Sequence, residues 1–541
     1  MNHRTTLLTI LAFAPFLASA ATNVWTGGGD GSSWDDPANW GGTVPVAGDT
    51  AVFSASATVN TSDASTISLC DISVADGATV IVSAKVDIPS DVTWDVGEGA
   101  MLRFNAAMSG AGGVVKEGAG ELWFNVAGSR TGSTEVNEGV LSLTNQKELG
   151  TSLVVGDGVH DATVQMRYTS KYSVQVFSGN ATILVRNHGV LDFETLAQGA
   201  AALNVNNSVT AITVEEGGIF KAGRFLFIMP GNSAAPVFSC AGTTTSAETM
   251  GGIQFRSGQV TVPETITQKV TIDSRLMPQR GYNNGTLYGT IAVPSVQDVP
   301  VELELAGPVV SSWSGLDGIN KRGAGTLRLS SSRNNYGGDP NEGLTRIYEG
   351  TVLVDNVSGS GTGYSKVDVR AGTTLGGTGF IGGLTEDIVI SGRSTAYATN
   401  AIVTATGTSG NPAVIAPGTI GNDTGAHICG TLTVGGAEQS SSVTFGNYTT
   451  LRVSLDAPDL HDCLRVYGTI DIGATGTALE ISLPTDIAAM RPGNYVIASA
   501  TEGISGSFAS RSLSSDGIVV TVGANEIVAT IPRRETVLFL R

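Results

Sequence analysis

The sequence is poor in cysteine, in charged residues and in aromatic residues. Of its 541 residues, 4 are cysteines, 14% are charged and 6% are aromatic. Such few and scattered cysteines exclude the disulfide framework of a small secreted domain, and none lies in a CxxC pair that would mark a structural zinc site. Cys429 and Cys463 are close enough in sequence to lie on neighbouring structural repeats. Whether they form a disulfide depends on the register, so both states stay open.

Basic residues are outnumbered by acidic ones. The chain has 30 Lys and Arg against 48 Asp and Glu, which gives a formal net charge of -18. A charge of this sign repels nucleic acid and anionic lipid headgroups. We therefore expect no nucleic-acid partner, and we expect the acidic surface to serve solubility.

The patterns that mark common catalytic and cofactor sites are missing. The sequence has no GxSxG, HExxH, phosphate-binding P-loop or EF-hand spacing. Residues 377–382 match GxGxxG, but no helix is readable after them, and a dinucleotide site needs one to hold the pyrophosphate. We predict that this segment is a corner between strands, and that the chain has no cofactor, no metal and no catalytic residue.

The densest group of titratable residues lies late in the chain. It consists of Asp456, Asp459, His461 and Asp462. Paired carboxylates beside a histidine would serve glycoside cleavage if they faced one groove. Asp462 equally fits a turn residue ahead of a strand, which is the interpretation we favour. Other isolated histidines are predicted to be structural, namely His160, His188 and His427.

Glycine, by contrast, is abundant and regularly placed. The chain has 71 glycines, and short strands with alternating apolar residues surround many of them, as in 72–82 and 94–104. The pattern recurs about every 20 to 30 residues without any amphipathic helix of useful length, which excludes helical solenoids. The sequence therefore predicts an all-β, right-handed parallel β-helix. About 20 to 25 coils, each rising about 4.8 Å, would make a rod about 100 Å long.

Two segments match each other more closely than the rest. Residues 116–124 read KEGAGELWF and residues 321–329 read KRGAGTLRL. Each continues through a turn to a second glycine strand, EGVLSL at 138–143 and EGTVLV at 349–354. The second segment has six more residues at its turn, since 28 positions separate Lys321 from Glu349 and 22 separate Lys116 from Glu138.

The pattern K-x-G-A-G-T-L-x-L, followed by Y-G-G at 336–338 and E-G-T-V-L-V, resembles the autotransporter-associated β-strand repeat, also called the passenger-associated transport repeat. The likeness covers 307–508 and, more weakly, 110–144, and it implies an exported passenger with a β-helix fold. An autotransporter continues into a membrane barrel. Only about 33 residues follow Phe508, too few for eight strands of about ten residues, so we expect this chain to lack the barrel.

The N-terminal part of the chain suggests two further units. Residues 1–20 combine Arg4, an apolar run and Ala18-Ser-Ala20, as in a signal peptide that is too short to span a membrane. Residues 21–60 are rich in Trp and Gly and are predicted to cap the first coil. A sugar-binding aromatic surface is an alternative there. A Ca²⁺ loop, formed by Asp30, Asp35, Asp36 and Asp49, is another.

The β-helix is predicted to extend over 61–510, with the transport repeats near 110–144 and 321–354. A strand-rich tail, 511–541, would follow. Its apolar end, 536–541, is predicted to be a final strand, with a sorting or attachment signal as the alternative.

These features predict an exported, non-catalytic protein with a structural or adhesive role. We expect it to be extracellular, at the cell surface or associated with the outer membrane, although the periplasm stays open. Its expected partners are surface glycans or other cell-surface proteins, and no transmembrane span is expected in the mature chain. The alternative is a polysaccharide-binding or polysaccharide-cleaving β-helix protein, such as a lyase or glycoside hydrolase, because the fold alone does not exclude it.

Overall fold

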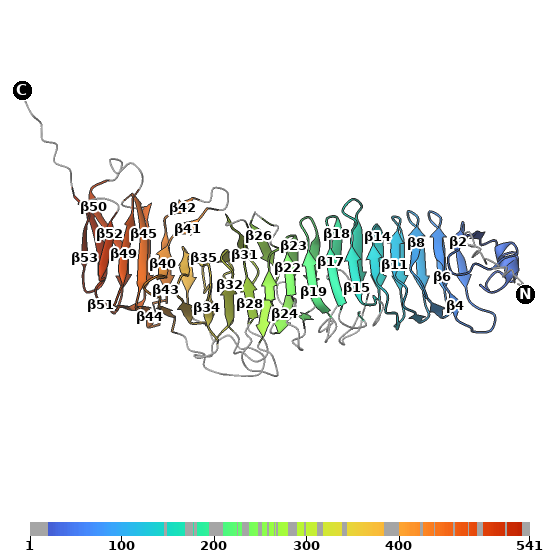
Figure 1. Ribbon diagram of the computed structural model, residues 1–541, viewed down its shortest axis with the longest axis horizontal. Coiled ribbons are helices and arrows are strands. Elements are labelled where there is room, and N and C mark those ends of the chain that lie inside the picture. The colour runs from blue at the N-terminus through green and yellow to red at the C-terminus, as the bar shows by residue number, and fades with distance from the viewer. Residues whose placement is uncertain are drawn as a thin grey trace, which may run out of the picture.

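A computed structural model describes residues 20–532 apart from 145–148, 168–176, 178–180, 194–208, 224–225, 230–236, 247–251, 257–258, 264–265, 267–268, 280–288, 297–298, 311–317, 338–342, 383–399, 422–425, 438, 458–459, 474, 484–490 and 514–516. The predicted signal peptide and the apolar end at 536–541 thus lie largely or wholly outside the described residues. The described coils stack into a rod with the N-terminus at one end and the C-terminus at the other (Figure 1).

The first long face of the rod is a parallel sheet of 19 strands. Its strands, in chain order, are β1 (Thr22–Val24), β2 (Thr50–Phe53), β5 (Asp71–Val74), β8 (Val92–Val96), β11 (Val114–Glu117), β13 (Thr134–Val136), β15 (Ser152–Val155), β17 (Ala181–Val185), β19 (Val209–Val214), β22 (Val237–Cys240), β25 (Gln259–Thr261), β28 (Gly289–Ala292), β32 (Ile319–Arg322), β34 (Thr345–Ile347), β36 (Val367–Val369), β39 (Ile402–Ala405), β44 (Ser441–Phe445), β48 (Gly468–Ile472) and β51 (Gly503–Gly506).

The second long face is built in the same way, one strand per coil. It contains β3 (Ala57–Val59), β6 (Thr79–Val82), β9 (Met101–Phe104), β12 (Glu121–Phe124), β14 (Gly139–Leu143), β16 (Ala162–Met166), β18 (Gly189–Asp192), β20 (Ile219–Gly223), β23 (Thr243–Ser246), β26 (Val270–Asp273), β31 (Glu302–Leu305), β33 (Thr326–Leu329), β35 (Thr351–Val354), β37 (Thr374–Gly377), β40 (Ala413–Pro417), β45 (Thr449–Ala457), β49 (Ala478–Ser482) and β52 (Ser510–Leu513). A short strand, β46 (Leu460–His461), pairs antiparallel with β45.

A third side is covered only in parts. Near the N-terminus it holds β4 (Ile67–Ser68), β7 (Val86–Asp87) and β10 (Met108–Ser109), and in the middle β21 (Leu226–Met229), β24 (Gly252–Arg256) and β27 (Leu276–Gln279). Near the C-terminus it holds β38 (Phe380–Ile381), β43 (Thr431–Val434), β47 (Cys463–Val466) and β50 (Gly493–Ala500). Two short hairpins leave the coils, β29 (Ser295–Val296) with β30 (Val299–Pro300), and β41 (Thr419–Ile420) with β42 (His427–Ile428).

The core is a column of apolar side chains stacked at matching positions of successive coils. On the second face, Val80 lies opposite Leu102, which lies opposite Leu122, and the column continues through Leu141 and Val164. All five side chains are fully buried. Neighbouring residues on each strand point outwards because side chains alternate along a strand. The predicted all-β parallel β-helix is therefore confirmed.

The coils vary in length more than the sequence pattern indicates. Thr50 lies opposite Asp71 in the next coil, whereas Val403 lies opposite Val443, almost twice as far along the chain. The long steps reflect insertions that leave the coil between strands. In the described part of the chain the first long sheet accordingly has 19 strands, slightly below the roughly 20 to 25 coils expected from an even division of the chain.

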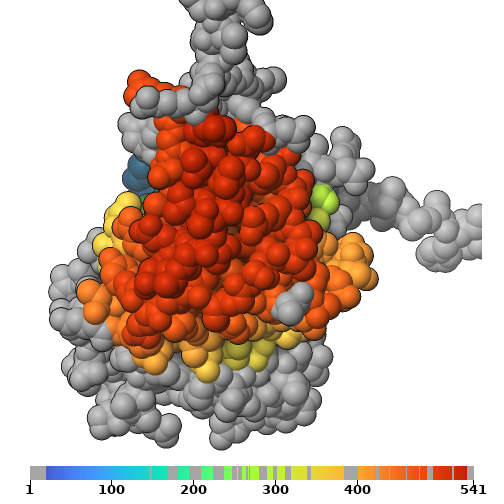
Figure 2. Space-filling model, turned by 90° about the vertical axis from the view of Figure 1, so that its left-hand side faces the viewer, coloured from blue at the N-terminus to red at the C-terminus, as the bar shows by residue number. Residues whose placement is uncertain are grey.

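The C-terminal end is closed by a change of strand direction. β54 (Glu526–Ile531) pairs antiparallel with β50, and β53 (Val519–Val522) pairs antiparallel with β54. These pairings occupy the outer edge of β50, which would otherwise expose its backbone amides and carbonyls. Figure 2 looks along the rod at this end and shows the last coils, coloured red, filling the end face.

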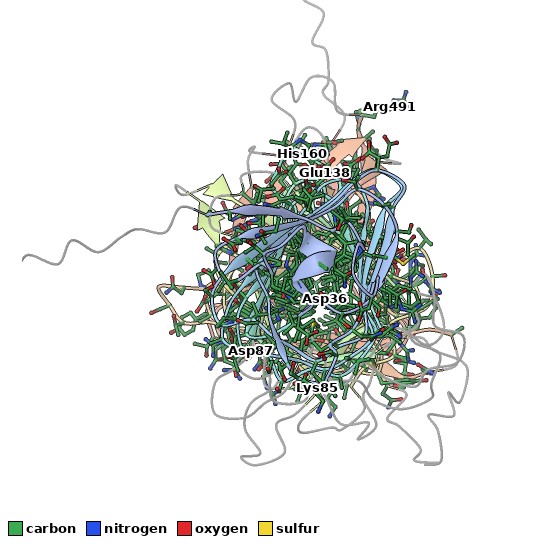
Figure 3. The ribbon with its side chains drawn as sticks, turned by 90° about the vertical axis from the view of Figure 1, so that its right-hand side faces the viewer. Asp36, Lys85, Asp87, Glu138, His160 and Arg491 are labelled. Atoms are coloured by element: carbon green, nitrogen blue, oxygen red, sulfur yellow. The ribbon has the colours of Figure 1, made fainter. Side chains whose placement is uncertain are left out.

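The N-terminal end is covered by a short turn of 3-10 helix, η1 (Pro37–Trp40), whose N-cap Asp36 accepts a hydrogen bond from the Ala38 amide. Figure 3 shows Asp36 near the middle of the end view, while Lys85, Asp87, Glu138 and His160 lie at the periphery. Two of the tryptophans that the sugar-binding alternative would need on the surface point inwards instead. Trp34 and Trp40 are buried and pack edge to face, with ring centroids 4.7 Å apart, above the first coils.

Asp49 ties this end of the chain to the first coil. Its carboxylate accepts hydrogen bonds from the amides of Ala21 at 2.9 Å and Val46 at 3.0 Å, and from the Asn23 side chain at 3.3 Å. These bonds, led by the one from Val46, hold the pKa of Asp49 below its usual range. The Asp30 carboxylate likewise accepts hydrogen bonds from Ser32, Ser33 and Asn39. The carboxylates of Asp49 and Asp30 thus accept hydrogen bonds from the protein itself.

We expect acid to loosen the N-terminal end through Asp49. Because its folded pKa lies below the unfolded value of about 3.9, its stabilising contribution is complete above about pH 4 and is lost as the pH falls through the folded pKa. An Asp49→Asn variant should therefore be less stable at pH 7 and show a weaker loss between pH 5 and 2. Tryptophan fluorescence during acid titration measures this; parallel curves for the two proteins would contradict it.

No helix in the portion of the chain that the structure describes is long and apolar enough to cross a membrane.

Candidate functional site

The two matching segments fold into the same unit of two successive coils. The first unit is formed by β11, β12, β13 and β14, and the second by β32, β33, β34 and β35. In both, the first strand pairs with the third and the second with the fourth. Lys116 lies opposite Val136 and Lys321 lies opposite Ile347, so the step between coils is six positions longer in the second unit. The extra residues predicted for the second unit therefore lie in the turn between its strands.

A fully buried lysine begins the turn of the first unit. Lys116 points its Nζ atom at three carbonyl oxygens, those of Glu117 at 2.9 Å, Gly118 at 2.5 Å and Glu138 at 2.9 Å. Glu117 and Gly118 belong to the same coil, while Glu138 belongs to the next one. The three donors of one ammonium group thus join the turns of two successive coils.

The second unit repeats this arrangement. Lys321 is fully buried, and its Nζ atom donates to the carbonyls of Arg322 at 3.0 Å, Gly323 at 2.6 Å and Glu349 at 3.0 Å. Burial lowers the pKa of Lys321 to about 7 and that of Lys116 to about 8, because the charged form loses its hydration. The carbonyl oxygens replace that hydration, so the lysine functions as a cap between coils.

The glycines of the units are needed where these turns stack. Gly139 and Gly350 adopt left-handed backbone conformations, with φ of 72° and 70°. A Cβ atom on Gly350 would lie 2.5 Å from the Gly323 carbonyl oxygen, and one on Gly139 would lie 2.5 Å from that of Gly120. Only glycine therefore lets the second turn of each unit approach the first this closely.

The return strand of each unit starts with a buried threonine whose partner differs. In the second unit, the hydroxyl of the fully buried Tyr336 lies 2.8 Å from the Thr345 hydroxyl. In the first unit, the guanidinium of the buried Arg130 donates to Thr134 and to the Ser133 carbonyl at 2.7 Å. The tyrosine of the Y-G-G motif in the second unit and Arg130 in the first thus provide a hydrogen-bond partner for the same buried threonine position.

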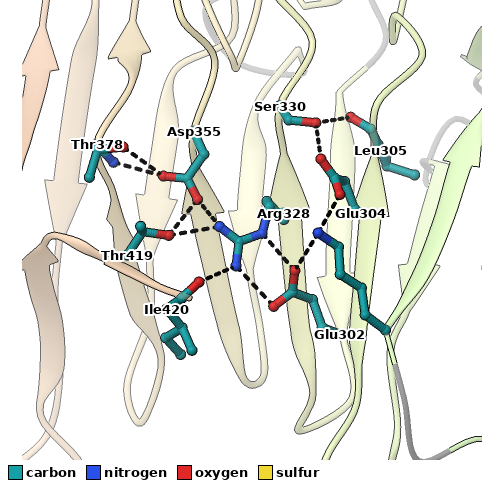
Figure 4. A network of polar contacts seen from close by, with 10 residues as sticks. Glu302, Glu304, Leu305, Arg328, Ser330, Asp355, Thr378, Thr419 and Ile420 are labelled. Atoms are coloured by element: carbon teal, nitrogen blue, oxygen red, sulfur yellow. Dashed lines mark hydrogen bonds and ion pairs between the residues drawn. The ribbon is translucent and has the colours of Figure 1, made fainter. Parts of the chain in front are cut away.

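A network of ion pairs covers the outer surface of the second unit (Figure 4). Arg328 on β33 makes two hydrogen bonds to Glu302 on β31, at 2.6 and 3.0 Å, and an ion pair with Asp355, which follows β35. The same guanidinium donates to the Thr419 hydroxyl at 2.7 Å and the Ile420 carbonyl at 2.8 Å. Arg328 thereby holds strand β41 of the protruding hairpin against the second face.

The base of this hairpin meets the β45–β46 hairpin in a cluster of polar side chains. Asp462 follows β46 and is 1% exposed, and its carboxylate lies 2.8 Å from Nε2 of His427 on β42. Two backbone amides orient the carboxylate, those of Ser454 at 2.8 Å and Gly430 at 3.1 Å. The buried Cys429 lies beside it and contacts the Ser454 carbonyl, 3.6 Å from Sγ.

The chemistry of this cluster does not favour a nucleophilic thiol. Burial first, and then the neighbouring carboxylates of Asp462 and Asp456, raise the pKa of the Cys429 thiol. The hydrogen bond to Asp462 raises the pKa of His427 above its usual value, so the imidazole is largely committed to the carboxylate and is poorly placed to remove the thiol proton. What the three side chains do offer is one nitrogen, one sulfur and one oxygen donor, all within 4.8 Å of one another.

The structure places Asp462 and Asp456 of the predicted acidic group near Cys429, and it places His461 elsewhere. Asp462 points into the cluster, whereas His461 lies against the third side, with Nε2 3.1 Å from the Val496 carbonyl. Asp459 lies outside the described residues. The turn position favoured for Asp462 matches its place after β46.

The remaining candidates have local partners. His160 lies 2.7 Å from the Asp157 carboxylate and His188 lies 2.9 Å from that of Asp161. The GxGxxG segment contains the last residue of β37 and the whole of β38. Gly377 pairs with Gly418, next to β41, through hydrogen bonds of 2.7 and 3.0 Å. All four cysteines, including Cys429 and Cys463, are free in the structure.

Sequence reasoning misses the most informative side chains. Lys116 and Lys321 belong to a recognisable motif, but nothing about a lysine in a hydrophilic turn indicates complete burial. The residue types of His427 and Cys429 do not by themselves predict that the two side chains lie together. Only one residue separates them in the sequence, at the end of one hairpin, and this short spacing is the signal that could have predicted it.

A comparison with known families bears on the two units. The Passenger-associated-transport-repeat family matches residues 114–143 and 319–354, which begin and end at the outer strands of the two units. In this chain the sequence pattern of the family thus corresponds to a two-coil unit with a buried lysine and stacked glycines. No curated protein matches the chain.

Proposed function

Because the chain carries two passenger-associated transport repeats and therefore is of the autotransporter passenger type, we propose that it is an exported protein that forms a rigid rod at the cell surface. The observation that supports this most directly is that both repeats are embedded in one uninterrupted ladder of parallel strands. Such a ladder resists local opening because every coil is paired on both sides. The role we infer is structural or adhesive presentation, with surface glycans or other cell-surface proteins as partners.

We further propose that the rod is not an enzyme. Glycoside hydrolysis needs a pair of carboxyl groups that are free to act on the substrate. On the second face of this rod, the carboxylates of Glu302 and Asp355 are occupied by Arg328, and that of Glu304 by Lys269 at 2.5 Å. These acids stabilise the coils and are not free for proton transfer.

A panel of acidic and neutral polysaccharides, incubated with the purified chain, tests this proposal. We expect no new reducing ends and no unsaturated products, whether or not a glycan binds. An Asp462→Asn variant serves as the matched protein for any activity that is found. Turnover by the parent chain that disappears in the variant would show a glycan-cleaving enzyme and would overturn the proposal.

A further inference from the structure

We propose that His427, Cys429 and Asp462 form a binding site for a divalent transition-metal ion, and that Zn²⁺ is the ion that fits best. The site lies where the β41–β42 and β45–β46 hairpins leave the rod. It is independent of the transport repeats and of the proposed presentation role. It also revises the expectation, drawn from the absence of a CxxC pair, that the chain holds no metal.

The donor set points to zinc. An imidazole nitrogen, a thiolate sulfur and a carboxylate oxygen are the three ligand types that Zn²⁺ takes in proteins, whereas Ca²⁺ and Mg²⁺ take oxygen alone. Here one donor of each type lies within 4.8 Å of the other two. Ligands at about 2.0 to 2.3 Å from a tetrahedral ion are roughly 3.5 Å apart, so small side-chain rotations close the site.

The protein holds the carboxylate ready before any ion arrives. The Ser454 and Gly430 amides fix the Asp462 carboxylate from behind, which is the hydrogen-bonded support that metal ligands commonly have. Gly418 leaves space beside His427 and Asp462, because a Cβ atom on residue 418 would lie 2.5 Å from the His427 ring. This crowding explains why glycine stands at the foot of β41.

The site has an entrance. The His427 side chain is 40% exposed, whereas that of Asp462 is 1% exposed, so an ion reaches the buried carboxylate past the imidazole. Binding replaces the hydrogen bond between Nε2 and the carboxylate by two metal bonds, and the imidazole gives up its Nε2 proton to solvent and keeps a proton on Nδ1. The Cys429 thiol leaves the Ser454 carbonyl and becomes a thiolate, and its proton is released to solvent. Water or Asp456, whose carboxylate lies near Cys429, completes a fourfold site.

An ion at this position would fasten the hairpin at its base. His427 belongs to β42, whereas Asp462 belongs to the next coil. Arg328 already holds the other strand of the hairpin through Thr419 and Ile420. The hairpin would then be anchored at both strands, which gives the ion a structural role.

Cobalt absorption provides the test, because Co²⁺ occupies zinc sites and reports on its ligands. We titrate the purified, reduced chain with Co²⁺ and then with Zn²⁺. We expect a sulfur-to-cobalt charge-transfer band, strong visible bands of a tetrahedral ion, and loss of both on addition of one equivalent of Zn²⁺. The Cys429→Ser variant should lose the charge-transfer band, and His427→Gln should weaken Zn²⁺ binding at least tenfold.

Two neighbouring residues serve as matched controls. Cys463→Ser removes a buried cysteine, and His461→Gln a histidine, from outside the cluster, and both variants should bind Co²⁺ like the parent chain. Far-ultraviolet circular dichroism checks that each variant keeps its β structure. The proposal is overturned if the parent chain gives no charge-transfer band, or if the band survives in Cys429→Ser. It is also overturned if mass spectrometry of the chain purified without reductant shows a Cys429–Cys463 disulfide.

Discussion

Replacement of Lys321 by Met is expected to destabilise the rod by about 3 kcal/mol or more, and to do so locally, because Met fills a similar volume but donates no hydrogen bond. The partly buried carbonyls of Gly323 and Glu349 would then lose the lysine donor, whereas the Arg322 carbonyl keeps its hydrogen bond from the Val293 amide. Each unsatisfied buried polar group costs about 1 to 3 kcal/mol, and relaxation of the turns recovers part of the sum. Denaturant unfolding followed by circular dichroism measures the change.

Lys85→Met is the control for this variant, because Lys85 is exposed and lies in the N-terminal coils. It should change stability by less than about 0.5 kcal/mol. Native-state hydrogen exchange then locates the effect of Lys321→Met. We expect faster exchange in β32 to β35 and unchanged exchange in β5 to β9, since each coil contacts only its neighbours. A Lys321→Met rod as stable as the parent would show that the lysine does not join the coils.

The second large effect is expected from Gly350→Ala compared with Gly99→Ala. Both glycines are left-handed, with φ of 70° and 67°, so both substitutions carry the same backbone cost of about 1 to 2 kcal/mol. They differ in surroundings. A Cβ atom at Gly350 would overlap carbonyls of the preceding turn, whereas one at Gly99 would have nothing within 4 Å.

The difference in stability between the two alanine variants therefore measures the contribution of the stacked turns in the transport repeat. We expect Gly350→Ala to be less stable than Gly99→Ala by a further amount of about 1 to 3 kcal/mol, the usual cost of overpacking. Thermal unfolding of both proteins under identical conditions measures the difference. Equal stabilities would mean that the second turn moves aside without cost, and that the close approach of the turns is not needed.

Much of the fold could be predicted because the pattern is local. Alternation of apolar residues, as in Val80 and Val82, marks strands with one buried side, and left-handed glycines such as Gly77 mark the corners between them. A parallel stack then follows from their recurrence. The number of coils is less predictable, because insertions such as that between Val403 and Val443 carry no periodic signal.

The candidate sites were less predictable, since they depend on register between coils. His427 and Asp462 come from different coils, and the step between coils in this part of the chain is far shorter from Val443 to Ile470 than from Val403 to Val443. Because the number of residues per coil varies so much, the sequence does not predict that these two residues lie side by side. The burial of Lys321 could not be predicted either, because it results from the turn of the next coil packing over it.

The rod is expected to be presented outside the cell, and labelling of intact cells shows whether it is. Antibodies against the purified chain are applied to cells of the native host before and after permeabilisation, and external protease is applied in parallel. We expect intact cells to be labelled as strongly as permeabilised ones, and external protease to remove the signal. Labelling that requires permeabilisation, together with protection from protease, would place the rod inside the cell envelope and would rule out presentation at the surface.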